Sequence, residues 1–325
     1  MGDRGNISRV YEKTAGKLTS ELDFIEPLYD RALLCGRAAE TREVSYIFST
    51  WGMWQLTAAE IKEYFPSLEA VFYAAGSVKG FAREFLSAGV EVYSAWAANG
   101  IPVAQFTAAE IRLALKGFYS SVHNGGGEWR NHGGAQYFPG IMDAKVGLIG
   151  AGMIGRLVAG ELSGLPVEVL IYDKFMDSER VTALGGRKAS LEEIFSECDV
   201  ISNHLANVPE TVGMLSYELF SRMKPNAVFI NTGRGAQVDC DGMIRALTEV
   251  GTRTAVLDVT DPDEPPSFGS PLLTMKNVFL TPHIAGSMGN EIHRMAEFMY
   301  EEYMSLARGE PVRYAVTPGM LETMA

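Results

Sequence analysis

Short apolar runs alternate with amphipathic stretches along most of the chain, a pattern typical of a mixed α/β protein. In the first hundred residues the pattern predicts strands at 44–48, 68–73 and 90–93, and short helices at 57–64 and 80–87. The first helix opens with Thr57-Ala-Ala-Glu60, the form of a capping box. The first part of the chain is therefore predicted to be an α/β unit in its own right.

The middle of the chain repeats the strand and helix alternation more regularly. Apolar runs predict strands at 146–149, 167–172, 199–202, 227–230, 254–257 and 278–280, and a helix at 154–162. Such repeated βα units predict a doubly wound parallel sheet, which binds ligands at the carboxyl ends of its strands.

Two further features divide the chain. The sequence Asn99-Gly-Ile-Pro-Val103 interrupts the pattern before a predicted helix at 103–118, so a domain crossing is expected near residue 100. A final helix is predicted at 288–306. The tail at 309–325 is expected to return to the first unit.

A glycine motif follows the strand at 146–149. Gly150, Gly152 and Gly155 spell G-x-G-x-x-G. In a βαβ unit the first glycine permits a tight turn, the second lets a pyrophosphate approach the backbone, and the third lets helix and strand pack closely. The N–H groups at the helix start, with Met153 and Ile154, would bind the phosphates. The alternative is a turn that binds nothing, and the strands, helix and acid in register argue against it.

An acidic residue stands where this motif expects one. The strand at 167–172 ends at Asp173, about 20 residues after the glycines, where an acid binds the adenosine ribose. A carboxylate accepts hydrogen bonds from a free 2′-hydroxyl and repels a 2′-phosphate. Lys174 beside it weakens that discrimination. We therefore predict NAD as the cofactor, with NADP less favoured.

Composition narrows the class of protein. The 325 residues, 47% hydrophobic and 21% charged, suffice for two globular domains. A net charge of −12 argues against a nucleic-acid or anionic-membrane partner. Cys35, Cys198 and Cys240 are scattered, so neither a disulfide framework nor a metal site is predicted. The start has no signal-peptide core and no apolar run reaches membrane-spanning length, so we expect a cytoplasmic protein with a small-molecule partner.

The segment 120–143 is rich in glycine and aromatic residues, among them Gly125-Gly-Gly127, Trp129, Tyr137 and Phe138. A loop of this length is often functional, and an arm that embraces a second subunit is one interpretation. A surface excursion without such a role is the other, and the sequence favours neither.

Polar clusters follow three successive predicted strands, at the edge where ligands bind. They are Asn231-Thr-Gly-Arg-Gly235, Asp258-Val-Thr-Asp-Pro-Asp-Glu-Pro265 and Thr281-Pro-His-Ile-Ala-Gly286. An Arg, a carboxylate and a His here fit the reduction of a carbonyl beside a carboxylate. Arg234 would bind the carboxylate with its planar fork of donors. His283 would donate the proton as hydride arrives, and a carboxylate on its other ring nitrogen would fix the tautomer.

These motifs resemble the D-isomer-specific 2-hydroxyacid dehydrogenase family in kind, order and spacing. The matching segments are Gly150–Gly155, Asn231–Gly235 with Val238-Asp239, Leu257-Asp-Val259 and Thr281–Gly286. The resemblance implies a Rossmann nucleotide domain at 103–299 and a smaller flavodoxin-like α/β substrate domain from 1–102 and 300–325. It also implies a homodimer joined through the nucleotide domain, and NAD-dependent interconversion of a 2-oxo acid and its D-2-hydroxy acid.

The resemblance assigns roles to Arg234, which anchors the 2-oxo acid, and to a Glu–His pair that contains His283. The acid is ambiguous, because the loop Asp261-Pro-Asp-Glu-Pro265 looks one residue longer than usual. Counting from the Asp-Val strand end selects Asp263, and the Glu-Pro pairing selects Glu264. We predict Glu264, whose longer side chain reaches an imidazole more easily. Gln105 replaces a common Glu without consequence for catalysis.

The resemblance also implies binding residues. Those expected to border the cofactor are His204, Pro209, Thr232, Asp258 and Gly286. The amides of Ser77 and Val78, with Asn99, are expected to meet the substrate carboxylate. His204 could equally be a packed loop residue, and the small-residue loop 75–79 could be a plain turn.

Two alternatives compete with this function. Formate-dehydrogenase-like chemistry resembles a site with Gln beside the His, and the acid in this loop argues against it. An NAD(H)-sensing, corepressor-like protein of the same fold would bind the cofactor without turnover. The substrate itself is open, because Trp51, Met53 and Trp54 could line a less polar pocket or belong to the core.

Overall fold

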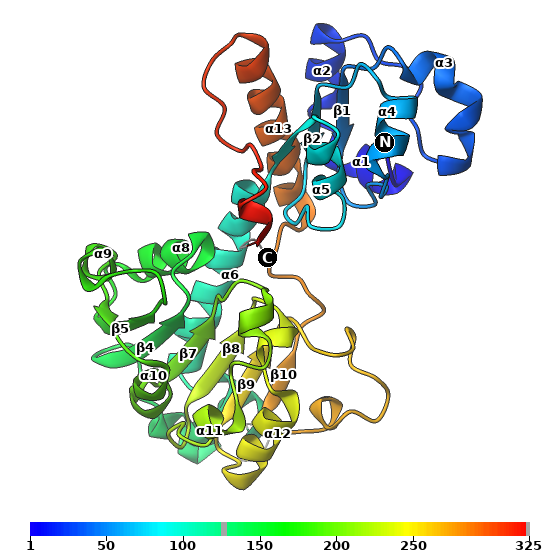
Figure 1. The fold of residues 1–325 in the computed structure, drawn as a ribbon. Helices are drawn as coiled ribbons and strands as arrows, with labels where there is room; N and C mark the ends of the chain where they lie inside the picture. The colour runs from blue at the N-terminus through cyan, green and yellow to red at the C-terminus, as the bar shows by residue number, and fades with distance from the viewer. Residues whose placement is uncertain (125–128, 323–325) are drawn as a thin grey trace. The chain divides into compact units, whose positions relative to one another are not determined.

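The computed structural model describes residues 1–124 and 129–322. The chain forms two compact units, each with its own sheet (Figure 1). Among the described residues, the first unit joins Met1–Gly100 to residues 287–322, and the second is Ile101–Gly286.

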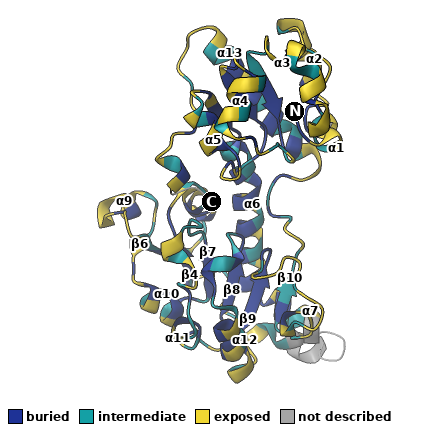
Figure 2. Ribbon diagram, turned by 45° about the vertical axis from the view of Figure 1, so that its right-hand side comes forward, coloured by how far each residue is buried: buried dark blue, intermediate teal, exposed yellow. Residues whose placement is uncertain are grey.

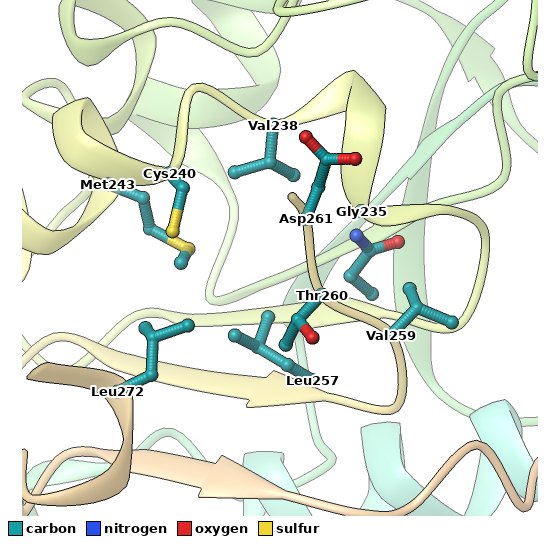
Figure 3. A pocket seen from close by; sticks show the side chains of 10 residues that line it. Gly235, Val238, Cys240, Met243, Leu257, Val259, Thr260, Asp261 and Leu272 are labelled. Atoms are coloured by element: carbon teal, nitrogen blue, oxygen red, sulfur yellow. The ribbon is translucent and has the colours of Figure 1, made fainter. Parts of the chain in front are cut away.

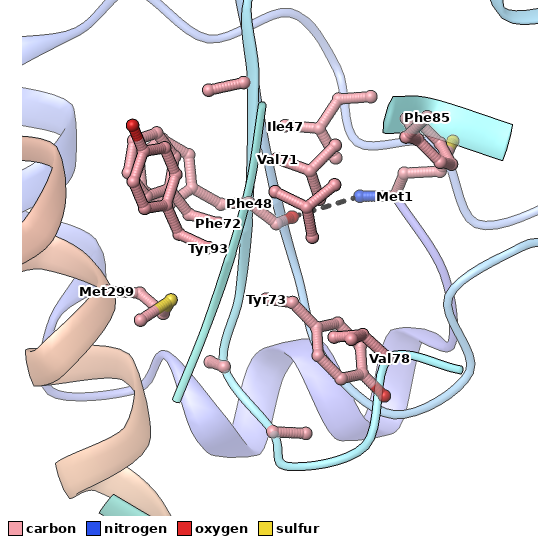
Figure 4. Close-up of a cluster of buried hydrophobic side chains, with 14 of the residues drawn as sticks. Met1, Ile47, Phe48, Val71, Phe72, Tyr73, Val78, Phe85, Tyr93 and Met299 are labelled. Carbon is pink, nitrogen blue, oxygen red and sulfur yellow. Dashed lines mark hydrogen bonds between the residues drawn. The ribbon is translucent and has the colours of Figure 1, made fainter. Parts of the chain in front are cut away.

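The sheet of the first unit has the parallel order β1-β2-β3. Its strands are β1 (Tyr46–Ser49), β2 (Ala70–Tyr73) and β3 (Glu91–Ser94), at the predicted places. Phe48, Phe72 and Tyr93 are in register and stack with ring centroids 5.0 Å apart in each neighbouring pair (Figure 4). This aromatic ladder fixes the register, because a slip by one residue would turn every ring to the other face.

Helices cover this sheet on both faces. They are α1 (Arg4–Val10), α2 (Ala15–Glu21), α3 (Ala38–Thr41), α4 (Ala58–Tyr64), α5 (Ala82–Ser87) and α13 (Ile292–Ala307), with 3-10 turns η1 (Arg31–Leu33), η2 (Cys35–Arg37), η7 (Gly289–Glu291) and η8 (Met320–Glu322). The predicted capping box is present, with the Glu60 carboxylate accepting from the Thr57 N–H at 2.8 Å. Met299 of α13 is fully buried against the aromatic ladder (Figure 4). Because the apolar face of α13 packs here, the second unit boundary lies at 286/287, earlier than the predicted 299/300.

The C-terminal tail returns to the first unit, as predicted. The Val316 N–H donates to the Val92 carbonyl at 2.7 Å, beside the edge strand β3. Glu302 of α13 is fully buried and accepts from the Arg313 and Tyr314 N–H groups, both at 2.6 Å. This carboxylate therefore holds the returning segment to the helix.

The second unit contains a seven-stranded parallel sheet in the described residues, ordered β10-β9-β8-β7-β4-β5-β6 (Figure 1). Its strands are β4 (Ala144–Ile149), β5 (Val167–Tyr172), β6 (Arg187–Lys188), β7 (Val200–Asn203), β8 (Val228–Asn231), β9 (Thr254–Leu257) and β10 (Val278–Leu280). The order reverses between β4 and β7, the switch point at which such sheets bind ligands. The predicted fold class, a Rossmann domain with a second α/β domain, is confirmed.

Both faces of this sheet are covered, as Figure 2 shows by the buried strands. The helices of the unit are α7 (Phe118–Asn124), α8 (Met153–Leu162), α9 (Ser178–Ala183), α10 (Leu191–Glu197), α11 (Tyr217–Phe220) and α12 (Cys240–Glu249), with 3-10 turns η3 (Trp129–Tyr137), η4 (Pro209–Thr211), η5 (Gly235–Gln237) and η6 (Pro271–Leu273). Leu148 belongs to a buried cluster with residues of α6 (Trp96–Leu115) and α8, whereas Ile149 belongs to another cluster with residues of α10, α11 and α12. Successive strand residues thus face opposite layers, which explains the apolar runs.

The helix α6 (Trp96–Leu115) begins seven residues before the predicted start at 103. The Asn99 N–H already donates to the Ala95 carbonyl at 3.0 Å, and Pro102 lies inside the helix. Ala98 and Ala104 on either side are buried. The prediction was wrong because packing on both sides outweighs the cost of an internal proline, about 3 kcal/mol.

The segment 120–143 is partly helical rather than a long loop, since α7 and η3 occupy most of it. Gly125-Gly-Gly127 lies outside the described residues. Within the described ranges no helix is long and apolar enough to cross a membrane, and no group of His, Cys, Asp or Glu has the arrangement of a metal site.

Candidate active site

The glycine motif forms the turn between β4 and α8, and each glycine has its own reason. Gly150 has φ +94°, and a Cβ there would lie 2.7 Å from the His204 carbonyl oxygen. A Cβ on Gly155 would lie 2.0 Å from the Gly150 carbonyl oxygen, so only glycine fits. A Cβ on Gly152 would meet no atom of the described chain within 4 Å. The second glycine therefore borders open space, as a pyrophosphate site requires.

The N-terminus of α8 is open to a ligand. Gly152 is the N-cap and has no side chain to bond the first helical N–H groups, among them those of Met153 and Ile154. These groups have no partner within the helix, and the helix dipole is positive at this end. The turn therefore fits the pyrophosphate of a dinucleotide.

Asp173 lies at the end of β5, beside the glycine turn. Its carboxylate accepts from the N–H groups of Ala151 at 2.8 Å, Phe175 at 2.8 Å and Met176 at 2.9 Å. Three donors leave one lone-pair position of the four for an outside hydroxyl. Lys174 is exposed next to it.

His204 lies at the switch point, where its N–H donates to the Ile149 carbonyl at 2.7 Å. Its Nε2 lies 3.0 Å from the Ser202 hydroxyl. Burial lowers the pKa of His204 to about 4, so the ring is neutral at physiological pH. These contacts give His204 a packing role against the glycine turn.

Arg234 follows β8, and its backbone is held from both sides. Its N–H donates to the Gln237 amide oxygen at 3.2 Å, and its carbonyl accepts from the Asn231 amide at 3.0 Å. Burial lowers the pKa of the guanidinium, while the negative charge of Glu264 opposes this lowering. Arg234 thus remains a cation within the electrostatic reach of Glu264.

His283 follows β10 and contacts the acid of the preceding loop. Its Nδ1 is hydrogen-bonded to Glu264 Oε1. Asp263 does not take this place; its carbonyl accepts from the Thr260 hydroxyl at 2.6 Å. His283 has φ +54° and a side chain 48% exposed, so the strained backbone turns its ring outward. The Nε2 side of the ring is left to meet a ligand.

Asp258, directly after β9, holds the turn that contains His283 in place through hydrogen bonds. It is 3% exposed, and its carboxylate accepts from the Thr281 hydroxyl at 2.5 Å and from the N–H groups of Ile284 at 2.8 Å and Ala285 at 2.9 Å. It therefore binds both flanks of His283 and fixes that residue. From the sequence we predicted Asp258 at the cofactor, and this positioning role was not foreseen. The only sequence signal was the acid at the end of a buried strand.

Three other predicted cofactor residues lie on the same edge. The Thr232 hydroxyl, 7% exposed, lies 2.9 Å from that of Thr107. Pro209 opens an exposed 3-10 turn after β7, and Gly286 follows the His283 turn. The Thr232 hydroxyl is therefore largely occupied by its hydrogen bond to Thr107 of α6.

A pocket beneath these loops is too small for a substrate. It holds about 10 Å³, room for one water, and Leu257, Leu272, Met243 and Cys240 are among the side chains that line it (Figure 3). We regard it as a packing gap under the Arg234 turn.

The predicted carboxylate loop of the first unit follows β2. Within the described chain no acceptor bonds the N–H groups of Ser77 or Val78. The Ser94 hydroxyl lies within hydrogen-bond distance of two carbonyls of this loop, those of Ala75 at 2.9 Å and Gly76 at 2.7 Å, and so stabilises the loop. Asn99 instead accepts from the Ser287 N–H at 3.0 Å. The free amides fit an anion, whereas the Asn99 oxygen ties two chain segments together.

Comparison with known proteins decides the family. The family model described as D-isomer specific 2-hydroxyacid dehydrogenase, NAD binding domain, matches residues 113–285, more than half of the chain. The chain belongs to the D-isomer-specific 2-hydroxyacid dehydrogenase family. The predicted resemblance is thereby confirmed, and with it the NAD-binding character of the second unit, hereafter the NAD domain.

Relatives within this dehydrogenase family are moderately similar. The D-3-phosphoglycerate dehydrogenase of Archaeoglobus fulgidus is 31% identical over 237 residues, 72% of this chain and 44% of that protein. The glyoxylate reductase of Thermococcus litoralis is 33% identical over 171 residues, 53% of this chain and 51% of that protein. The chain thus spans about half the length of the curated relatives it matches.

A solved structure supports the fold. The phosphoglycerate oxidoreductase from Rhizobium etli superposes with a TM-score of 0.77 at 22% identity, over 94% of this chain and 93% of that one. At this identity the likeness shows the architecture of the dehydrogenase family alone.

Proposed function

We propose that the chain is an NAD-dependent oxidoreductase that interconverts a 2-oxo acid and its D-2-hydroxy acid. The observation that carries this proposal is the contact between Glu264 and His283, within the electrostatic reach of Arg234. An imidazole with a carboxylate on one nitrogen is a proton donor of fixed tautomer, and a nearby guanidinium is a binder of carboxylates.

When bound at the glycine turn, NADH would supply the hydride for the carbonyl carbon. His283 donates the Nε2 proton to the carbonyl oxygen, and Glu264 stabilises the protonated imidazole that precedes this transfer. The products are the D-2-hydroxy acid, NAD⁺ and a neutral His283, which takes the proton back in the reverse direction.

Arg234 binds the carboxylate of the 2-oxo acid and withdraws charge from its carbonyl. Its backbone bonds to Gln237 and Asn231 keep the residue in place before substrate arrives, so little ordering entropy is lost on binding. The amides of Ser77 and Val78, together with Asn99, stay proposed ligands of the same carboxylate.

We propose NAD rather than NADP, because Asp173 presents a carboxylate where a 2′-phosphate would lie. Lys174, His204, Pro209, Thr232, Asp258 and Gly286 are the further residues proposed to border the cofactor. Two named relatives, a D-3-phosphoglycerate dehydrogenase and a glyoxylate reductase, are consistent with a small 2-oxo acid as substrate.

A homodimer through the NAD domain is also proposed. Leu113, Phe118, Val122 and Tyr137, on the consecutive elements α6, α7 and η3 of this domain, are 38–70% exposed, and a partner subunit that covered them would bury apolar surface. The cytoplasm stays the predicted compartment. Sedimentation of the purified protein tests the dimer.

The experiment that tests the function is simple. Purified protein is mixed with NADH and a series of 2-oxo acids, and the loss of NADH absorbance is followed. Turnover with formation of the D-product supports the proposal. A change in NADH fluorescence without oxidation by any acid would instead support the NAD(H)-sensing alternative and overturn the enzyme.

A further inference from the structure

Three large apolar side chains lie in the loop that follows β1. Trp51, Met53 and Trp54 belong to residues 50–55, here called the Trp51 loop. The Thr50 hydroxyl donates to the Ala74 carbonyl at 2.7 Å, and the Met53 N–H donates to the Thr50 carbonyl at 3.1 Å. These bonds give the loop a defined turn at the carboxyl end of the sheet.

The three side chains are only partly buried. They pack against the core of the first unit, but the core itself is closed by fully buried residues such as Leu56, 2% exposed, and Phe72, 0% exposed. Trp51, Met53 and Trp54 therefore each keep a surface that the fold does not use. Partly exposed tryptophans at strand ends are an expected feature of a ligand-binding surface.

The Trp51 loop runs beside the loop that presents the Ser77 and Val78 amides. A Cβ on Gly80 would lie 3.4 Å from the Gln55 side-chain amide, so the two loops are in contact at that point. They leave adjacent parallel strands, which lie about 4.8 Å apart. A 2-oxo acid held by its carboxylate at the amides therefore has its side chain within reach of the Trp51 loop.

Charge around the Trp51 loop disfavours a phosphorylated side chain. Residues 50–55 carry no charged group, and Lys79, in the neighbouring loop, interacts electrostatically with Glu322. A Cβ on Gly52 would lie 2.7 Å from the Asp3 Cβ, so an acid lies against the loop. A phosphate needs cationic or N–H partners of its own.

We propose that Trp51, Met53 and Trp54 bind the side chain of the substrate, so that the preferred substrate is a 2-oxo acid with an uncharged aryl or branched alkyl group. A phosphorylated 2-oxo acid is rejected. This inference rests on the proposed function, and it names the substrate class.

The test compares four acids with the full chain and NADH. They are phenylpyruvate, 4-methyl-2-oxopentanoate, glyoxylate and 3-phosphohydroxypyruvate. We expect kcat/KM for phenylpyruvate to exceed that for glyoxylate and 3-phosphohydroxypyruvate by about tenfold to a hundredfold, as the burial of one large apolar group predicts. Glyoxylate has no side chain and serves as the internal reference.

Two variants separate a specificity role from a structural one. Trp51→Ala and Trp54→Ala should each lower kcat/KM for phenylpyruvate by about tenfold or more and leave that for glyoxylate within about threefold. The control Leu33→Ala removes a side chain of η1 in the same unit that is 55% exposed, and it should change kcat/KM for neither acid. Trp51→Arg should raise kcat/KM for 3-phosphohydroxypyruvate while lowering that for phenylpyruvate.

The outcomes are distinguishable. If glyoxylate or 3-phosphohydroxypyruvate is preferred, or if the tryptophan variants lower kcat/KM equally for all four acids, the proposed substrate class is wrong. The proposed dehydrogenase activity would be unaffected by that result. If none of the four acids is reduced by the unaltered protein, the proposed function itself fails and this inference with it.

Discussion

Replacing Asp258 with Asn should free the segment around His283 from its hydrogen-bonded support. In the structure one carboxylate oxygen accepts from the Thr281 hydroxyl and the Ile284 N–H, and the other from the Ala285 N–H. An amide can accept at only one of its two positions, so one buried donor would face the NH₂ group.

The cost follows from burial and charge. Asp258 is 3% exposed, and a hydrogen bond to a charged group contributes about 1.5–3 kcal/mol. Loss of one such bond, and of the charge that strengthens the other two, should lower the free energy of unfolding by about 2–4 kcal/mol. In a domain of the size of the NAD domain, the midpoint of thermal unfolding should then fall by about 4 to 16 °C.

Activity should fall as well, because His283 has φ +54°, a conformation that costs a non-glycine residue about 1–2 kcal/mol. Without its support the segment relaxes and the imidazole moves, which should reduce kcat/KM by about 10- to 100-fold. Calorimetry and steady-state kinetics on the purified variant measure both effects.

The matched control is Asp263→Asn, an exposed acid in the neighbouring loop whose contact with Thr260 is made by its backbone carbonyl. This variant should behave like the unaltered protein. If Asp258→Asn had the same midpoint of thermal unfolding and the same kcat/KM as Asp263→Asn, the supporting role of Asp258 would be refuted.

Other expectations concern the cofactor turn and pH. The Cβ of Gly155→Ala would lie 2.0 Å from the Gly150 carbonyl oxygen, so this variant should lower the free energy of unfolding by about 3 kcal/mol and abolish NADH binding. Gly152→Ala, whose Cβ would meet no atom of the described chain within 4 Å, should weaken NADH binding without changing the free energy of unfolding. Calorimetry measures both quantities. Burial raises the pKa of Glu110 from 4.5 to about 6, so the folded state binds this proton more tightly than the unfolded state, and the free energy of unfolding should fall as pH rises between those values. The fall should be about 1 kcal/mol after solvent screening. Glu110→Gln should abolish it, as urea titrations at several pH values can measure. Asp173→Ala should raise the NADPH to NADH ratio of kcat/KM about tenfold, and an unchanged ratio would contradict its ribose contact.

The sheets were predictable because their strands are buried on both faces. Runs such as Val228–Asn231 are apolar at nearly every position, which few other structures allow. The helix α6 was harder, since Pro102 and Gly100 locally mimic a break and only tertiary packing overrides them. The short helices before residue 43 were not predicted at all, because seven or fewer residues carry little periodicity.

The candidate site was predictable where chemistry follows a motif. Arg234, Glu264 and His283 stand at strand ends in recognisable sequences, and the structure brings the last two into contact. The support from Asp258 was not predictable, because its partners lie 23 to 27 residues away and are mostly backbone groups. Backbone donors have no signature in a sequence.

The proposed reaction requires His283 to deliver the proton to the carbonyl oxygen. The most direct measurement is the single-turnover rate of NADH oxidation by a saturating 2-oxo acid in His283→Asn, which tolerates the same backbone conformation. The rate should fall by at least about a hundredfold while the Kd for NADH stays within about threefold. A rate close to that of the unaltered protein would show that the proton comes from elsewhere.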